Sequence, residues 1–208
     1  MVVTRILSIN DPQAIPAALK IIQEGGLIVF PTDTIYGLAA DPFNGEAILK
    51  IYQAKERPEE KALPVLIGEL SQMNDLVNSV SSHVSLIAAK YWPGALTIVL
   101  PKKPVLPIEL SAYQTIGIRM PNLDFTLALL KSTGPLATTS ANISGGANPT
   151  TAEDVLAQLD GRVDLILDGG STPGPTASTV VDATTEDLKI LREGPISLDV
   201  LMTLIHQA

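Results

Sequence analysis

Residues 27–67 read LIVFPTDTIYGLAADPFNGEAILKIYQAKERPEEKALPVLI, and this stretch decides the fold. An apolar run of strand character, Leu27 to Phe30, ends at a proline and is followed by a hydroxyl-rich loop, Thr32 to Gly37. Apolar residues at helical spacing then lead to a cationic cluster that starts at Lys55, and the chain returns to an apolar strand, Leu63 to Ile67. Loops at strand ends are where rigid scaffolds carry ligand-binding residues. The stretch therefore predicts a binding site at the ends of strands.

Strand-like and helix-like segments alternate along the whole chain. Asp11 and Pro12 predict the cap and first turn of the first helix, and Thr151 with Asp154 predicts a capping box. Some neighbouring strands have connections too short for a parallel crossover. We therefore expect an α/β (α+β) fold, a twisted sheet of mixed parallel and antiparallel strands flanked by helices, as a single domain over residues 1–208. In chain order the expected elements are strand 2–7, a helix ending before Gly25, strand 27–30, a helix ending near Lys55, strand 63–67, helices 71–77 and 84–91, strands 96–100 and 116–120, helix 124–130, strand 136–139, helix 151–161, strand 163–167, loop 168–176, strands 178–181 and 188–191, and helix 198–205.

The composition is that of a globular protein. Of the 208 residues, 46% are hydrophobic and 17% are charged, which is enough apolar material for a substantial core. Cysteine is absent, so disulfides and thiolate metal sites are excluded. The first residues, MVVTRILSIN, lack the basic and apolar regions of a signal peptide, and no apolar run is long enough to span a membrane. We expect a cytoplasmic protein without membrane contact.

The net charge of −8 restricts the class of partner. A broad, nonspecific grip on duplex nucleic acid needs a basic face, which this charge disfavours. Local clustering of cations becomes informative for the same reason, and Lys55, Arg57 and Lys61 lie close together. They predict a polyphosphate site, in which arginine forms forked hydrogen bonds and lysines act as point charges. The alternative is that they are structural cations, which interact with the dipole of the preceding helix and with two nearby glutamates.

Signatures of covalent, metal and cofactor chemistry do not occur in the sequence. The two histidines, His83 and His206, fall in expected helices far from the polar loops, which disfavours a histidine-based triad. The HExxH, calcium-loop, Walker and GxGxxG patterns are missing. What remains is a set of anion-binding and hydroxyl-bearing loops at strand ends.

Further candidates lie in later strands and in the loops that follow them. Ser140 and Asn142 come after an expected strand and before two glycines, so they either converge on a phosphate or nucleobase or form a turn. Arg119 lies inside an apolar strand and must find a partner, either a structural acid or a substrate carboxylate. Hydroxyl residues that bind a small polar ligand, or else stabilise loops and strands, are Thr32, Thr34, Tyr36 and Ser178. Together these groups predict a cleft for one polyanion and one small carboxylate.

Six motifs occur in an order that resembles one family. They are PTDTIYGL, KERPEEK, WPGALT, GIRMP, TSANISGG and STVVD, within a region from about Val2 to Gly194. The ordered set resembles the YrdC-type family, the threonylcarbamoyl-AMP synthases. The resemblance implies a YrdC-like fold with a large concave, positive cleft. It also implies a reaction in which L-threonine, bicarbonate and ATP give threonylcarbamoyl-AMP and pyrophosphate, with Mg²⁺ expected beside ATP and no organic cofactor.

The resemblance also implies roles for individual positions. Lys55 and Arg57 are the implied catalytic residues, because they hold ATP and the intermediate. The positions implied to bind ATP are Lys55, Arg57, Lys61, Ser140, Asn142 and Arg192. The positions implied to bind threonine are Thr34, Tyr36, Arg119 and Ser178, with Arg119 facing the carboxylate, and Thr32 of the same loop is grouped with them. No metal ligand is implied.

The chain departs from the family pattern at two places. Leu66 stands where members often carry a histidine that contacts threonine, which puts that contact in question. The additional C-terminal domain of one branch does not follow Arg192, as in the short, single-domain form.

The resemblance implies a downstream partner, a complex that transfers the threonylcarbamoyl group to an adenosine beside the tRNA anticodon, and direct contact with RNA stays open. Two other functions also stay open. One is a YciO-like relative or a carbamoyl-transfer module without synthase activity; the intact pairs Lys55–Arg57 and Ser140–Asn142 speak against the former. The other is an RNA-binding module of the same fold, which the net charge of −8 disfavours.

Overall fold

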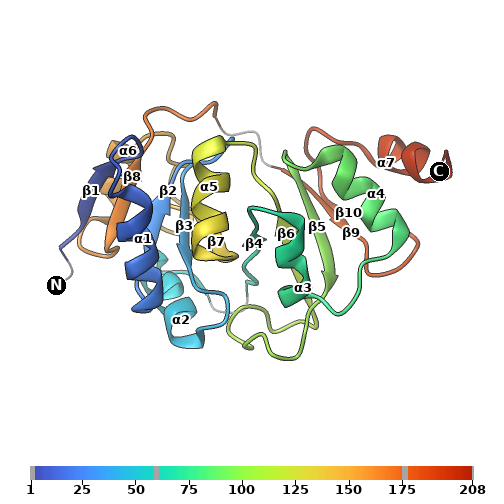
Figure 1. The fold of residues 1–208 in the computed structure, drawn as a ribbon, viewed down its shortest axis with the longest axis horizontal. Helices are drawn as coiled ribbons and strands as arrows, with labels where there is room; N and C mark the ends of the chain where they lie inside the picture. Colours follow the sequence, from blue (N-terminus) through green and yellow to red (C-terminus); the bar gives the residue numbers. More distant parts are fainter. Residues whose placement is uncertain (1–2, 59–60, 175–177, 208) are drawn as a thin grey trace.

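The computed structural model describes residues 3–58, 61–174 and 178–207 (Figure 1). The expected start of the first strand at Val2 and the end of the loop at 175–176 lie outside these residues. The described strands form one sheet in the order β1-β8-β2-β3-β7-β4-β6-β5-β9-β10. The strands are β1 (Arg5–Ser8), β2 (Ile28–Phe30), β3 (Gly37–Ala40), β4 (Val65–Leu66), β5 (Leu96–Pro101), β6 (Thr115–Arg119), β7 (Leu136–Ser140), β8 (Leu165–Asp168), β9 (Thr179–Asp182) and β10 (Lys189–Arg192). The helices are α1 (Ala14–Gln23), α2 (Gly45–Lys55), α3 (Met73–Leu76) after a 3₁₀ turn (Leu70–Gln72), α4 (Ser82–Tyr91), α5 (Asp124–Thr133), α6 (Ala152–Leu159) and α7 (Leu198–His206).

The sheet mixes parallel and antiparallel pairs. Strand β2 runs parallel to β8 and antiparallel to β3, and β4 runs parallel to β6 and antiparallel to β7. Strand β5 likewise pairs antiparallel with β6 and parallel with β9. The predicted mixed α/β architecture is confirmed.

Alternation of side chains separates the two faces of the sheet. Ile28 and Phe30 of β2 pack in an apolar cluster with α1 and α5, whereas Val29 packs in another cluster with α2 and α6. Because successive strand residues point to opposite faces, helices cover both faces of this half of the sheet. In the other half, Ile116 and Ile118 of β6 belong to the cluster that holds the buried residues of α4. The alternate residues of β6 therefore point away from α4, toward the face where the site is found.

The chain after Phe30 differs from the sequence prediction. A loop leading into a helix is expected there, but strand β3 lies between them and forms an antiparallel hairpin with β2. All four β3 residues, GLAA, are buried, and β3 lies between β2 and β7. A strand buried on both faces shows no polar alternation, so its sequence does not distinguish it from part of a helix. The hydroxyl-rich loop is therefore the connection of a hairpin.

Helix ends show one correction and one confirmation. Helix α1 begins at Ala14, with Gln13 rather than Asp11 at its cap position, and the Asp11 carboxylate accepts the N–H of Gln13 at 2.8 Å in the turn before the helix. The capping box of Thr151 and Asp154 is present at the start of α6. The other elements lie within a few residues of their predicted positions.

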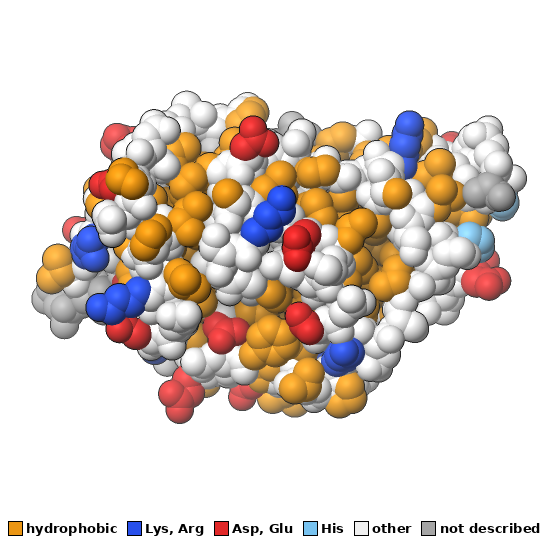
Figure 2. All heavy atoms as spheres, in the orientation of Figure 1, with side chains coloured by type: hydrophobic (Ala, Val, Ile, Leu, Met, Phe, Trp, Pro, Cys, Tyr) orange, Lys and Arg blue, Asp and Glu red, His pale blue; other side chains and the backbone are white. Residues whose placement is uncertain are grey.

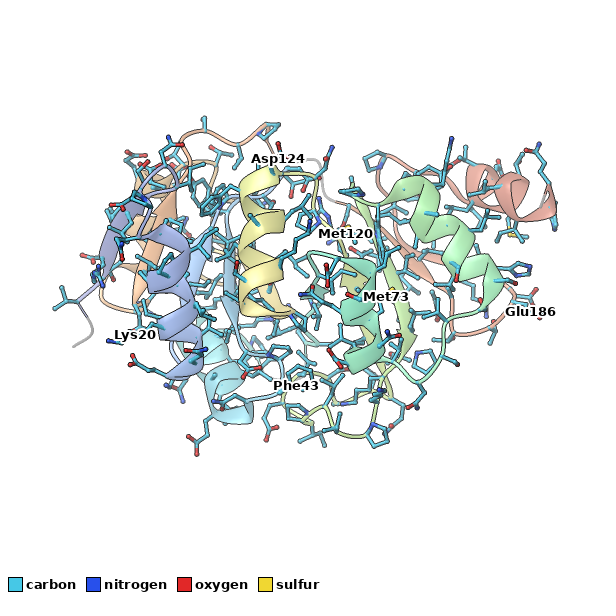
Figure 3. The ribbon with its side chains drawn as sticks, viewed as in Figure 1. Lys20, Phe43, Met73, Met120, Asp124 and Glu186 are labelled. Atoms are coloured by element: carbon cyan, nitrogen blue, oxygen red, sulfur yellow. The ribbon has the colours of Figure 1, made fainter. Side chains whose placement is uncertain are left out.

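Helix α5 anchors the start of the hydroxyl-rich loop, near the middle of the molecule. Figure 3 shows Lys20 of α1 and Glu186 of the β9–β10 turn toward opposite ends of the long axis, with Asp124 at the start of α5 between them. The Thr126 hydroxyl donates to the carbonyl of Pro31 at 2.6 Å, and both residues are buried. This bond fixes the point at which the loop leaves β2.

We predict that Thr126→Val destabilises the fold by about 1–3 kcal/mol, because valine keeps the shape but leaves the buried Pro31 carbonyl without a donor. The measurement is the free energy of unfolding from urea denaturation. Thr133→Val in the same helix is the matched control, since Thr133 donates to the Leu129 carbonyl within its own helix and to the Gly134 carbonyl next to it. Equal losses in the two variants would contradict the anchoring role.

Candidate active site

A cavity of about 580 Å³ opens on the sheet face that points away from α4. Its lining comes from the loop between β2 and β3, the segment that leads into β4, and strands β5, β6, β7 and β9. On β6 the lining includes Thr115, Gly117 and Arg119, which alternate with the two isoleucines that pack in the core. The volume is within the range of small-molecule sites.

Glycines make the floor of the cavity. A Cβ at Gly117 would lie 2.9 Å from Thr97 Cγ2 and 3.7 Å from Pro64 Cβ, and one at Gly37 would lie 2.8 Å from Thr138 Cγ2. Both glycines lie within strands, where a residue without a side chain marks a close approach. The depth of the cavity thus depends on the absence of two side chains.

The charged residues in the described part of the cavity lining are all arginines. Among the described lining residues these are Arg57, Arg119 and Arg192, and no acidic side chain belongs to that lining. Burial lowers the pKa of Arg57. Burial, and then the nearby Arg119, lower the pKa of Arg192. The lining therefore concentrates positive charge, which favours an anionic ligand.

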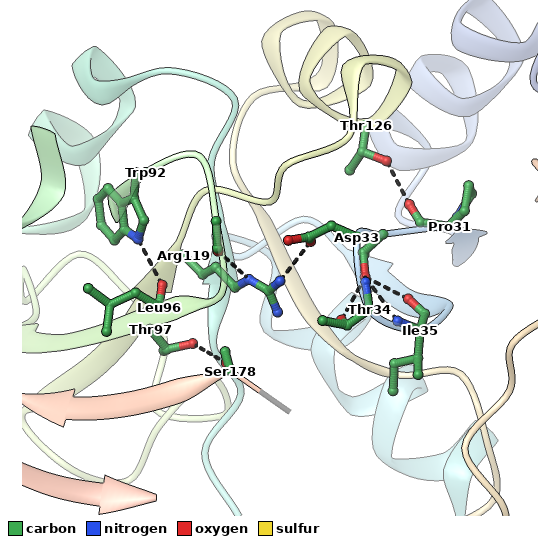
Figure 4. A network of polar contacts seen from close by, with 12 residues as sticks. Pro31, Asp33, Thr34, Ile35, Trp92, Leu96, Thr97, Arg119, Thr126 and Ser178 are labelled. Atoms are coloured by element: carbon green, nitrogen blue, oxygen red, sulfur yellow. Dashed lines mark hydrogen bonds and ion pairs between the residues drawn. The ribbon is translucent and has the colours of Figure 1, made fainter. Parts of the chain in front are cut away.

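Arg119 is held by an acid from the neighbouring loop (Figure 4). Its Nη2 atom donates to Asp33 Oδ1 at 2.6 Å, and its Nε atom donates to the Gly94 carbonyl at 3.0 Å. The side chains of Arg119 and Asp33 are only 10% and 15% exposed. The sequence left open whether Arg119 meets a structural acid or a substrate, and the structure supplies the acid.

Ser178 and Arg192 form a second polar group at the cavity. The Arg192 guanidinium donates to the Ser178 carbonyl at 2.9 and 3.1 Å and to its hydroxyl at 2.9 Å. The Ser178 hydroxyl also lies 2.9 Å from the Thr97 hydroxyl. A Cβ at Gly194 would lie 2.3 Å from the backbone nitrogen of Thr179, so the segment after β10 presses on the start of β9. These contacts fix the position of the Ser178 hydroxyl.

The loop hydroxyls are largely occupied by the loop itself. Thr32 donates to the Ile35 carbonyl at 2.7 Å and accepts the N–H groups of Thr34 and Ile35. The Thr34 hydroxyl lies 3.0 Å from that of Thr32. Such a hydroxyl-centred turn holds the backbone around Asp33 in one conformation.

The Tyr36 phenol is an anchor for the segment after β8. Its hydroxyl donates to the Gly170 carbonyl at 2.7 Å and accepts the N–H of Gly169 at 3.0 Å. Burial, and to a smaller extent the charge of Asp168, raise its pKa to about 12 against the lowering effect of the Gly169 bond. Tyr36 therefore stays protonated at neutral pH.

Lys55 lies below the cavity lining and is 2% exposed. Its Nζ atom donates to the carbonyls of Ser140 and Asn142 at 2.5 Å and approaches Asn142 Oδ1 at 3.4 Å. Burial, and then the nearby Arg57, lower its pKa to about 8. The lysine joins the end of α2 to the SANISGG turn and places a partly titratable charge beneath it.

Arg57 and Asn142 differ in how fully they are bonded. Among the described residues, Arg57 Nε is buried without a partner, while its Nη2 atom reaches the Ala62 carbonyl at 3.3 Å. The Asn142 amide donates to the carbonyls of Ile143 and Gly146, which closes the turn. Arg57 thus keeps one buried donor without a partner among the described residues, whereas the Asn142 amide nitrogen makes two hydrogen bonds.

The structure brings most of the predicted site residues to one cavity. Those in its lining are Thr32, Thr34, Tyr36, Arg57, Arg119, Ser140, Ser178 and Arg192, together with Leu66 at the position of the family histidine. Of the described residues predicted for the site, three are not in the lining: Lys55, Lys61 and Asn142.

Two polar residues that bond to predicted site residues are absent from the prediction: Asp33, which bonds Arg119, and Thr97, which contacts Ser178. Both lie inside the quoted motifs, PTDTIYGL and WPGALT, and the need of Arg119 for an acid was the available signal for Asp33.

Among the described residues, no group of three or more His, Cys, Asp or Glu side chains could hold a metal ion. Within the same residues, no helix has both the length and the apolarity to cross a bilayer.

Comparison with known proteins agrees with the motif analysis. The Sua5/YciO/YrdC family model, described as "Telomere recombination", matches residues 20–194. The threonylcarbamoyl-AMP synthase of Bacillus subtilis is 41% identical over 98% of this chain and 59% of its own length, and that of Pyrococcus abyssi is 37% identical over 91% and 56%. A putative threonylcarbamoyl-AMP synthase of Mycobacterium tuberculosis is 36% identical over 94% of this chain and 93% of its own. The chain thus spans less than two thirds of the first two relatives.

Solved structures agree with the fold. P. abyssi Sua5 complexed with L-threonine superposes with a TM-score of 0.88 and 34% identity, over 99% of this chain and 61% of that one. E. coli YciO superposes with a TM-score of 0.82 and 27% identity, over 97% and 100%. The predicted YrdC-like fold is confirmed.

We predict that the stability of the protein relative to a Lys55→Met variant rises between pH 8 and pH 10. The pKa of Lys55 is about 8 in the folded chain, against 10.5 as its ordinary value. Above pH 8 the folded state has lost a proton that the unfolded state still binds, so folding becomes more favourable as pH rises, by roughly 1–2 kcal/mol over this window. Unfolding free energies in urea at several pH values measure the difference.

Lys131→Met is the control for this experiment, because Lys131 is an exposed lysine on α5. The difference between the wild type and this variant should not change with pH in the same way. A flat difference for Lys55→Met as well would show that the ammonium group stays charged in its buried site.

Proposed function

The chain belongs to the Sua5/YciO/YrdC family, and from this premise we propose that it is an L-threonylcarbamoyladenylate synthase. It would combine L-threonine, bicarbonate and ATP and release pyrophosphate. The observation that carries the proposal is the cavity in which arginines from three distant segments, Arg57, Arg119 and Arg192, face one space without an acid in the described lining. A nucleotide and an amino acid together present the anionic groups that such a lining suits.

The proposed chemistry needs no covalent enzyme intermediate. The threonine ammonium group first gives up a proton, and the resulting amine and bicarbonate form a carbamate with loss of water. A carbamate oxygen then attacks the α-phosphorus of ATP, a new P–O bond forms, and the bond to pyrophosphate breaks. The carbamate oxygen is already anionic, so the protein has to position the reactants and stabilise charge.

We assign the nucleotide to the side of the cavity that holds Arg57 and Ser140. Arg57 lines the cavity, and its guanidinium suits a phosphate oxygen. Lys55 would contribute to catalysis without lining the cavity. Its ammonium group orients the carbonyls of Ser140 and Asn142 and would add positive charge near the phosphates. Lys61 and Arg192 complete the proposed set of nucleotide-binding cations, and Asn142 shapes the turn that contacts the nucleotide.

We assign threonine to the opposite side of the cavity. Arg119 would face its carboxylate, while the fixed hydroxyls of Ser178 and Thr34 are placed for its polar groups. Thr32 and Tyr36 would support this region through the loop rather than through direct contact. Leu66 would give an apolar wall where other members carry histidine.

Mg²⁺ is expected with ATP. Because the described residues hold no cluster of metal ligands, the ion would be bound by phosphate oxygens and water rather than by a protein cage. It would offset phosphate charge, and the residues of the chain would do the positioning.

The proposed product would pass to a tRNA threonylcarbamoyl-transfer complex in the cytoplasm. Binding of RNA by a broad basic surface has less support. Figure 2 shows Lys and Arg side chains scattered over the visible face, with Asp and Glu between them, and the net charge is −8.

We predict pyrophosphate release that requires L-threonine, bicarbonate and Mg-ATP together. The measurement is a coupled pyrophosphate assay in which each component is omitted in turn and the other amino acids replace threonine. No release with any amino acid would favour a YciO-like relative without synthase activity. Release with another amine but not with threonine would indicate a different carbamoyl-transfer module.

We predict that Arg57→Ala lowers the rate of this release by roughly 10²-fold, the usual effect of removing one charge-stabilising donor. Arg5→Ala is the matched control, because Arg5 is exposed on the edge strand β1. A wild-type rate in Arg57→Ala would remove this arginine from the proposed mechanism.

A further inference from the structure

The cavity poses an electrostatic problem for an amino-acid substrate. An α-amino acid carries a positive ammonium group beside its carboxylate, and the described lining offers three arginines and no acid. A cation placed among arginines is repelled unless a negative group lies next to it. The ligand therefore needs a carboxylate from just outside the lining.

Asp33 is the acid that meets this need. It is bonded to a lining arginine, Arg119, at 2.6 Å, and its side chain is 15% exposed. Figure 4 shows its carboxylate directed at the Arg119 guanidinium. Of its two carboxylate oxygens, one accepts from Arg119, and a carboxylate has further lone pairs for a second donor.

We infer that Asp33 and Arg119 form a clamp for the two charged groups of an α-amino acid, in which Asp33 binds the ammonium group and Arg119 the carboxylate. The inference rests on the proposed function. The ammonium nitrogen and the nearest carboxylate oxygen of an α-amino acid are about 3 Å apart, as their bond lengths require. Because Asp33 Oδ1 and Arg119 Nη2 are only 2.6 Å apart, the two side chains are close enough for the two charged groups of one amino acid to lie against them.

The clamp is preorganised by the bonds on either side of Asp33. The Thr32 hydroxyl accepts the N–H groups of Thr34 and Ile35, and Thr126 holds the Pro31 carbonyl. Arg119 is fixed independently by its bond to the Gly94 carbonyl. A ligand that meets two charges already in place loses little binding energy to rearrangement of the protein.

Other groups near the cavity do not offer the same recognition. The Tyr36 hydroxyl already donates to Gly170 and accepts from Gly169. Lys55 and Arg57 are cations. The two histidines, in α4 and α7, do not belong to the cavity lining. Among the described residues, Asp33 is the acid that forms an ion pair with an arginine of the cavity lining.

The test is binding of three ligands to the full chain, measured by titration calorimetry. They are L-threonine, 3-hydroxybutyrate, which lacks the amine, and L-threoninamide, which lacks the carboxylate. In Asp33→Asn we expect threonine and threoninamide to bind about 10- to 100-fold more weakly, because a charged hydrogen bond is lost, while 3-hydroxybutyrate binds as well as before or better. Asp33→Glu keeps the charge and should restore part of the threonine affinity. Asp11→Asn, distant on the turn before α1, is the matched control.

A purely structural role of Asp33, exerted through Arg119, gives a different pattern. It would weaken threonine and 3-hydroxybutyrate equally and leave threoninamide unchanged, and that result would overturn the clamp. If Asp33→Asn does not fold, the same comparison is made in Asp33→Ser, which removes the charge, and an unchanged preference for amine-bearing ligands in that variant would overturn the clamp. Wild-type pyrophosphate release is measured alongside. Threonine binding without release contradicts the proposed synthase but not the clamp, whereas release with intact amine discrimination in Asp33→Asn contradicts the clamp alone.

Discussion

An ion pair between two distant parts of the sheet holds the site together. Asp33 follows β2 and Arg119 ends β6, and in the sheet β3, β7 and β4 lie between these two strands. Both side chains are mostly buried, so each charge needs the other when no ligand is present. The bonds from Thr126 to the loop and from Arg119 to Gly94 set where the pair lies. The sides of the cavity proposed for the nucleotide and for the amino acid are positioned relative to this contact.

Much of the fold could be predicted from the sequence, because most elements carry a clear period or a cap. The capping box at Thr151 and the apolar stripe of α4 are examples. Strand β3 was missed because Gly37 to Ala40 are small and buried on both faces, so no alternation marks them. The start of α1 was placed too early because the Asp11 side chain bonds within a turn. In both cases the sequence fits two local structures equally well. Burial within the sheet decides the first case, and a local hydrogen bond decides the second.

The sequence indicates many of the residues that gather around the cavity. It does not indicate which of them line the cavity and which lie behind the lining. Arg57, Arg119 and Ser178, which the motifs single out, line one cavity. The motifs did not show that Lys55 is buried beneath it, since a lysine at the end of an amphipathic helix can point to solvent or inward. Asp33 was overlooked because an acid in a polar loop has no distinguishing pattern. Only the geometry shows that it is 2.6 Å from an arginine almost ninety positions later.

The glycine floor has a consequence for how such a site can change over evolution. Gly117 and Gly37 line the cavity without side chains, so the main chain of β6 and β3 forms part of its wall. Exchange of either glycine for alanine would bring a methyl group within 3 Å of a threonine on a neighbouring strand. Since contacts this short force one of the neighbouring groups to shift, a change of one codon would reshape the wall of the cavity while every arginine stays in the sequence.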